Sequence, residues 1–142
     1  MDIKDLEETH VVTSFIENEG GILILKRSEL VGAYQGLWAG VSGYLEENET
    51  PLERAVKEIE EEIGLENPEL VVEGEPVMSR DDTRIWVIHP YMFHSDSREV
   101  TLDWEHTDQR WISPSSIDEF DTVPRLSRTL ESVVRGIAIQ NR

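Results

Sequence analysis

Three glutamates near the middle of the chain, Glu58, Glu61 and Glu62, have the residue type and the spacing of a metal site. Positions i, i+3 and i+4 share one side of an α-helix, because the helix turns once every ~3.6 residues. Carboxylates grouped in this way repel one another by about 0.2–0.5 kcal/mol per pair. A hard divalent cation such as Mg²⁺ removes the repulsion and prefers oxygen ligands. The pattern therefore predicts a magnesium site, and its alternative is a solvated acidic face.

The segment around these acids has the signals of a helix that begins at Pro51 and ends at Ile63. Thr50 and Glu53 form the S/T-x-x-E capping box, and proline is favoured at the first helical position. Gly64 can end the helix in a left-handed conformation. The opposite side of the helix carries the apolar residues that predict its buried stripe, which are Leu52, Ala55, Val56, Ile59 and Ile63.

Apolar and β-branched runs predict the strands that hold this helix. A hairpin is expected from residues 10–17 and 22–25, with its turn at 18–21. Further strands are expected at 37–45, 70–72, 84–93 and 109–112, and an amphipathic helix at 124–139. Segments 28–36, 78–83 and 95–108 are expected to be loops. This order predicts an α/β protein, and the length suits a single domain, residues 1–142.

The composition excludes several classes of function. The chain has 13 Lys and Arg against 30 Asp and Glu, a net charge of −17, whereas nucleic-acid binding depends on clustered cations. No apolar run reaches the ~18–20 residues of a membrane helix, and no secretory signal begins the chain. We therefore expect a cytoplasmic protein that binds neither nucleic acid nor membrane. The low lysine content fits either an ordinary acidic protein or a salt-rich cytoplasm.

Residues 43–65 read GYLEENETPLERAVKEIEEEIGL, and this segment resembles the signature of the Nudix hydrolases. That signature is Gly, five residues, Glu, seven residues, Arg-Glu, an aliphatic residue, any residue, Glu-Glu, any residue, Gly and an aliphatic residue. The positions in register are Gly43, Glu49, Glu58, Ile59, Glu61, Glu62, Gly64 and Leu65. The exception is Lys57, which stands where the family has Arg. Lysine cannot make the planar, two-pronged contact by which that Arg orients the motif glutamates.

The resemblance implies an α/β/α sandwich with a mixed β-sheet and a particular reaction. The reaction is hydrolysis of the diphosphate linkage in a nucleoside diphosphate joined to another group. The implied cofactor is Mg²⁺, with Mn²⁺ as an alternative, and many relatives are homodimers. The whole chain also resembles archaeal Nudix proteins of unassigned substrate.

The same resemblance assigns roles to individual residues. The implied metal ligands are Glu58, Glu61, Glu62, Glu105 and the backbone carbonyl of Ser42. The general base is Glu58, Glu61 or Glu105, and we prefer Glu105 or Glu61. A solvated loop acid is an equal alternative for Glu105. The motif is supported by Gly43, Gly64 and a pairing of Glu49 with Lys57 or with a neighbouring cation.

Substrate phosphates need hydrogen-bond donors, and a base needs a stacking partner. Arg27 follows a predicted strand and has the geometry that suits phosphate, although a surface cation is an equal interpretation. Trp38, Trp86, Trp104 and Tyr34 are candidates for stacking on a base. Most tryptophans are core residues, so we expect at most one of these to contact substrate, and Trp38 is our choice.

Other interpretations are weaker. Cysteine is absent, which excludes disulfides, cysteine nucleophiles and the isopentenyl-diphosphate isomerases, whose fold is the same and which depend on a catalytic cysteine. His89 and His94 at i and i+5 would face opposite sides of a strand, so we expect core or surface histidines. The main alternative is a Nudix-like domain that binds a nucleotide or metabolite without hydrolysing it. Lys57 motivates this alternative, and the complete set of glutamates argues against it.

Overall fold

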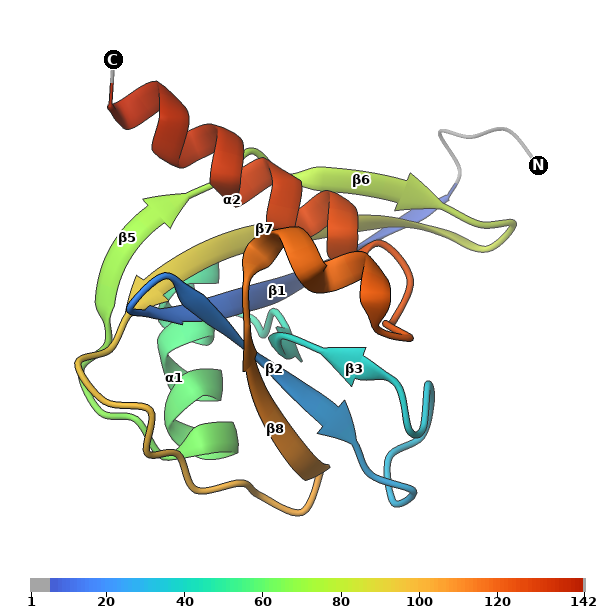
Figure 1. The fold of residues 1–142 in the computed structure, drawn as a ribbon. Coiled ribbons are helices and arrows are strands. Elements are labelled where there is room, and N and C mark those ends of the chain that lie inside the picture. The colour runs from blue at the N-terminus through green and yellow to red at the C-terminus, as the bar shows by residue number, and fades with distance from the viewer. Residues whose placement is uncertain (1–5, 142) are drawn as a thin grey trace.

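The computed structural model describes residues 6–141 (Figure 1). The N-terminal half contains β1 (Glu7–Asn18), β2 (Gly21–Arg27), β3 (Trp38–Ala39), β4 (Val41–Tyr44) and α1 (Pro51–Ile63). The C-terminal half contains β5 (Glu69–Glu73), β6 (Val77–Arg80), β7 (Arg84–His94), β8 (His106–Ile112), the 3-10 helix η2 (Pro114–Glu119) and α2 (Leu126–Gln140).

The described strands form one mixed sheet with β1 and β7 at its centre. The strand order is β3-β2-β1-β7-β5, while β4 pairs with β1, β6 with β7 and β8 with β2. β1 and β7 run parallel, and the other pairs are antiparallel. The helices α1 and α2 lie on different faces of this sheet (Figure 1). The predicted α/β/α sandwich with a mixed sheet is therefore confirmed.

Alternation along the central strands divides the core into two halves. Successive side chains of a strand point to opposite faces, so Val12 and Ile16 of β1 pack with α1, whereas Phe15 packs with α2. The α1 half includes Ala55, Ile59 and Ile63, and the α2 half includes Leu126, Leu130 and Val133. Within residues 6–141, neither helix is long and apolar enough to cross a bilayer.

The helix α1 begins and ends where the sequence predicts. The Glu53 amide donates to Thr50 Oγ1 at 3.1 Å, and Gly64 is left-handed, with φ of 69°. Leu52, however, is 36% exposed, so its predicted place in the buried stripe is wrong. Two charged residues, Arg54 and Glu62, are buried instead, because other parts of the chain cover the acidic side of the helix.

The strand expected at residues 37–45 is in fact two strands that pair with different partners. β3 pairs with β2, and β4 pairs with β1. The chain changes partner at Gly40, where a Cβ would lie 2.9 Å from the carbonyl oxygen of Ser14. A residue with a side chain would not permit this approach of two backbones.

Other boundaries also differ from the prediction. β6 (Val77–Arg80) takes up residues 78–80 of the expected loop 78–83, and Asp81 Oδ1 closes its turn by accepting the amides of Thr83 and Arg84. β8 begins at His106, within the expected loop 95–108. The last helix begins at Leu126 and not at residue 124, because Arg125 adopts a left-handed conformation with φ of 71°.

Candidate active site

The C-terminal end of α1 is covered by the segment that leads into β8. The Thr101 amide donates to the Ile63 carbonyl at 3.0 Å, and the Asp103 amide donates to the Glu62 carbonyl at 3.1 Å. These bonds satisfy carbonyl groups that a helix end leaves without intrahelical partners. They also bring Glu105 and His106 beside the last turn of the helix.

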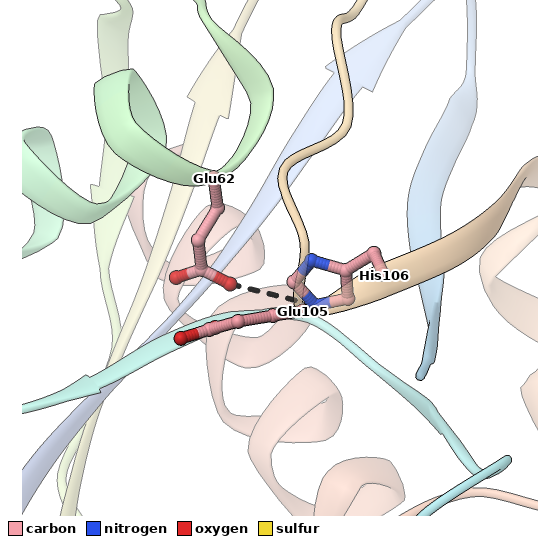
Figure 2. A group of neighbouring side chains, drawn as sticks. All are labelled: Glu62, Glu105 and His106. Carbon is pink, nitrogen blue, oxygen red and sulfur yellow. Dashed lines mark ion pairs between the residues drawn. The ribbon is translucent and has the colours of Figure 1, made fainter. Parts of the chain in front are cut away.

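Glu62 points from α1 into a buried group with Glu105 and His106 (Figure 2). Each of the three residues offers a ligand atom, and these atoms lie within 4.8 Å of one another. Glu62 is only 2% exposed. Its Oε1 lies 3.5 Å from His106 Nε2, and its Oε2 has no hydrogen-bond partner within residues 6–141. Burial, followed by the contact with Glu58 and the charges of nearby acids, raises the pKa of Glu62 well above its ordinary value.

His106 is fixed in this group by Asp103. Its Nδ1 lies 3.0 Å from Asp103 Oδ1, which also accepts the Glu105 amide at 3.1 Å. Burial lowers the pKa of His106, and the hydrogen bond to Asp103 opposes that change. The ring therefore has a defined orientation, with one nitrogen on Asp103 and the other directed at Glu62.

Glu58 lies one turn before Glu62 and rests against Gly43 of β4. Because Gly43 has no side chain, it leaves room for the Glu58 carboxyl group. A Cβ added to Gly43 would overlap the carboxyl group of Glu58. Arg54 Nη1 donates to Glu58 Oε1 at 3.0 Å and holds this carboxylate from the other side. The predicted support role of Gly43 thus has a physical cause, which is room for Glu58.

Arg54 also makes the two-pronged contact that Lys57 cannot make. Its Nε and Nη2 donate to the two carboxylate oxygens of Glu49 at 2.7 and 3.1 Å, which makes a bidentate pair. Lys57 is exposed and its Nζ lies 3.5 Å from Glu49. The cation that orients the motif acids is therefore Arg54, one turn before Glu58, and Lys57 adds only a weaker contact.

A cavity of about 510 Å³ adjoins these acids. Its lining includes Ser42, Gly43, Glu58 and Glu105, together with two cations, Arg27 and Arg125. Its aromatic lining residues are Tyr34, Tyr44, Trp86 and Trp104. The cavity thus joins acidic groups to cationic and aromatic groups.

Two of the predicted site residues lie elsewhere. Trp38 is 9% exposed and belongs to the core cluster under α2, with its ring against Phe120. Its burial prevents the predicted substrate contact, and Trp86 and Trp104 line the cavity instead. Glu61 is exposed and is not part of the cavity wall or of the group around Glu62, although its charge contributes to raising the pKa of Glu105.

Arg27 is one of the residues that line the cavity. Its Nε donates to the Ala33 carbonyl at 3.0 Å and so ties the 28–36 loop to β2. Its charge also opposes the rise in the pKa of Glu105, which burial and nearby acids cause.

Sequence reasoning missed three residues of this site. His106 and Asp103 form an i, i+3 pair at the start of β8, but the compared segment drew attention only to Glu105. Arg125 reaches the cavity because its left-handed backbone precedes α2, and its buried Nε has no hydrogen-bond partner among the residues that the structure describes. His89 and His94 lie apart from the site, since His89 contacts His10 and His94 contacts Glu17.

The model of the NUDIX domain matches residues 8–133 of the chain. The protein belongs to this family. It is a Nudix-type pyrophosphohydrolase, an enzyme that acts on phosphorus-containing anhydrides.

Curated relatives cover most of the chain. The nucleoside triphosphatase NudI of Enterobacter sp. (strain 638) is 30% identical over 128 residues, which are 82% of this chain and 89% of the relative. The NudI protein of Escherichia coli O139:H28 is 28% identical over 137 residues, 88% of this chain and 96% of the relative.

Solved structures share the fold. The E. coli ORF135 protein has a TM-score of 0.77 at 24% identity, over 95% of this chain and 94% of that one. The MutT protein from Methanosarcina mazei Go1 has a TM-score of 0.75 at 24% identity, over 92% and 96% of the two chains. These structures support the Nudix arrangement of the sheet and its two helices.

We expect Gly43→Ala to weaken the affinity for divalent cations by about tenfold or more, because displacing an oriented carboxylate costs at least as much as losing an outer-shell partner. Calorimetric titration with Mn²⁺ measures this change. The matched control is Gly32→Ala, whose Cβ would meet open space. Equal affinities for Gly43→Ala and the wild type would show that the site does not need Glu58 in its observed position.

The pair of Glu49 and Arg54 predicts a pH-dependent stability. The hydrogen bond from Arg54 lowers the pKa of Glu49 from 4.5 to about 2. A group with a depressed pKa stabilises the fold above its unfolded pKa, and this stabilisation is lost as the pH falls toward the folded pKa. The urea midpoint of the wild type should therefore exceed that of Glu49→Gln at pH 6, and the difference should shrink between pH 4.5 and about 2. Glu47→Gln, at an exposed position, should show no such difference, and a constant gap for Glu49→Gln would contradict the assignment.

Proposed function

We propose that the protein is a Mg²⁺-dependent hydrolase that cleaves the diphosphate linkage of a nucleoside diphosphate joined to another group. The observation that carries this proposal is the buried Oε2 of Glu62, which lies beside Glu105 and His106 and has no hydrogen-bond partner in the part of the chain that the structure describes. An ionised carboxylate is costly to bury without a cation, and carboxylates are the ligands that Mg²⁺ prefers. Mn²⁺ is the alternative cation.

The proposed ligands come from α1 and from the bend beside it. Glu58 and Glu62 are one turn apart and are our first choice. Glu105 and the Ser42 carbonyl are further proposed ligands, and Glu61, which is exposed, would have to turn toward the site to join them. When bound, the cation lowers the pKa of a water molecule, orients it and stabilises the leaving phosphate. The rigid helix keeps the carboxylates at a fixed spacing, so little rearrangement is needed during the reaction.

Glu105 is our proposed general base, with Glu61 as the second choice and Glu58 as the third. Glu105 lines the cavity, and burial followed by the charges of Asp103 and Glu58 raises its pKa. A base works best when its pKa lies near the operating pH, and a raised carboxyl pKa moves in that direction. Glu105 therefore lines the cavity and has a pKa that is shifted in the direction that suits a general base.

We assign the substrate phosphates to Arg27 and Arg125, which line the same cavity as the acids. Guanidinium groups offer several donors in a planar array that matches phosphate oxygens. Trp86 and Trp104 are our choices for stacking on a base, in place of Trp38. Nucleoside triphosphates belong to the proposed substrate class, with phosphate as the joined group, and the two curated relatives named above are called nucleoside triphosphatases.

We further propose that residues 1–142 act as a single domain in the cytoplasm, with no nucleic-acid or membrane partner. The net charge of −17 supports the exclusion of nucleic acid.

The test is a panel of nucleoside triphosphates and nucleoside diphosphate conjugates, incubated with Mg²⁺ and followed by identification of the products. We expect turnover that EDTA abolishes. Glu62→Gln should lower kcat/KM by more than ~100-fold, because a direct ligand contributes more than the outer-shell partners whose loss costs 10–100-fold. Glu60→Gln, an exposed position on the same helix, is the matched control and should retain activity.

The outcomes separate the two functional hypotheses. Tight binding of a nucleotide without any phosphate product would support the regulatory binding domain. Turnover that resists EDTA and survives Glu62→Gln would overturn the proposed metal site.

A further inference from the structure

His106 has two ring nitrogens with very different surroundings. Nδ1 lies 3.0 Å from the carboxylate oxygen of Asp103, an acceptor that places the ring proton on Nδ1. Nε2 then carries the lone pair of the neutral imidazole. The ring is enclosed, because its side chain is only 1% exposed, so water does not reach this lone pair freely.

Nε2 lies beside a carboxylate. Its neighbour, Glu62 Oε1, lies 3.5 Å away (Figure 2), which is longer than an ordinary hydrogen bond of about 2.7–3.2 Å. A lone pair and a carboxylate oxygen repel each other unless a positive charge lies between them. The second oxygen, Glu62 Oε2, has no hydrogen-bond partner among the described residues, and Glu105 is within the same 4.8 Å group.

The arrangement of Asp103, His106 and the open Nε2 is that of a metal-binding histidine. Ligating histidines almost always donate their other ring N–H to a carboxylate or carbonyl group, which fixes the tautomer and the ring orientation. Asp103 is itself held in place, because its amide donates to the Glu62 carbonyl and its Oδ1 accepts the Glu105 amide. The fixed Asp103 thus orients His106 toward the acids.

We propose that His106 Nε2 is a ligand of the divalent cation together with Glu62, so that the site is a mixed nitrogen and oxygen site that favours a divalent transition-metal ion such as Mn²⁺ over Mg²⁺. Mg²⁺ is bound through oxygen ligands, whereas imidazole suits transition metals. The proposal rests on the proposed function because it specifies the cation of that same site. It adds to the motif glutamates a nitrogen ligand that comes from β8.

The test uses Mn²⁺ alone, without substrate, and reads coordination directly. Electron spin-echo envelope modulation of the Mn²⁺-loaded protein should show coupling to ¹⁴N, and the coupling should disappear in His106→Gln. Calorimetry should show that the preference for Mn²⁺ over Mg²⁺ falls by about tenfold or more in the same variant. His94→Gln is the matched control, because His94 contacts Glu17 and Asp96 away from the site.

A second measurement covers the case in which His106→Gln does not fold. Wild-type protein with ¹⁵N-labelled histidine should lose the ¹⁴N coupling without any mutation, and single substitutions of His10, His89 and His94 in unlabelled protein should each retain it. Bound Mn²⁺ without histidine ¹⁴N coupling would overturn the proposal and would identify the His106 contact as a simple ion pair with Glu62. That result would leave the proposed function intact, since the proposed function fails only if the nucleotide panel gives no metal-dependent turnover.

Discussion

The burial of the Glu62 carboxylate at the end of α1 is the constraint on which the rest of the site depends. The C-terminal end of a helix carries a partial negative charge, and the last turn of α1 contains no basic residue. Glu58 and Glu105 add further negative charge, and both raise the pKa of Glu62. A compact acidic group of this kind is unfavourable in the empty protein and becomes favourable when a cation binds. A cation bound at this position would relieve the repulsion among these carboxylates.

The surrounding structure keeps the acids close in spite of their repulsion. Arg54 holds Glu49 and Glu58 from one side, and Gly43 leaves room for Glu58 on the other. Asp103 orients His106 and attaches the β8 segment to the end of α1. Arg54 thus offsets part of the repulsion at Glu49 and Glu58, while Glu58 and Glu105 line the cavity.

Local signals were sufficient to predict the parts of the site that lie on one element. The capping box at Thr50 and the glycine at position 64 define α1, because both act within a single turn. The register of the glutamates on that helix follows from its period. The exchange of partners between β3 and β4 at Gly40 was not predicted, because it depends on the approach of Ser14 from a distant strand.

The remaining parts depend on tertiary contacts that a single sequence does not specify. Arg54 makes the two-pronged contact expected of the motif Arg, because its side chain reaches both carboxylate oxygens of Glu49. Sequence spacing alone does not establish this contact. Trp38 and Trp86 have the same residue type, and only the three-dimensional arrangement makes one a core residue and the other part of the cavity wall. His106 contacts Glu62 in the last turn of α1, more than forty residues earlier in the chain, and the sequence does not specify this contact. Arg125 gains its role from a backbone conformation that its residue type does not favour.

The central claim is that Glu62 is a buried acid whose charge requires a divalent cation, and urea unfolding of the wild type and of Glu62→Gln tests it most directly. A carboxyl group whose folded pKa is raised destabilises the fold once the pH rises above its unfolded value. In EDTA at pH 7, Glu62→Gln should therefore be more stable than the wild type, and Mg²⁺ or Mn²⁺ should stabilise the wild type far more than the variant. A variant that is less stable than the wild type in EDTA, together with equal stabilisation of both proteins by the cation, would contradict the account.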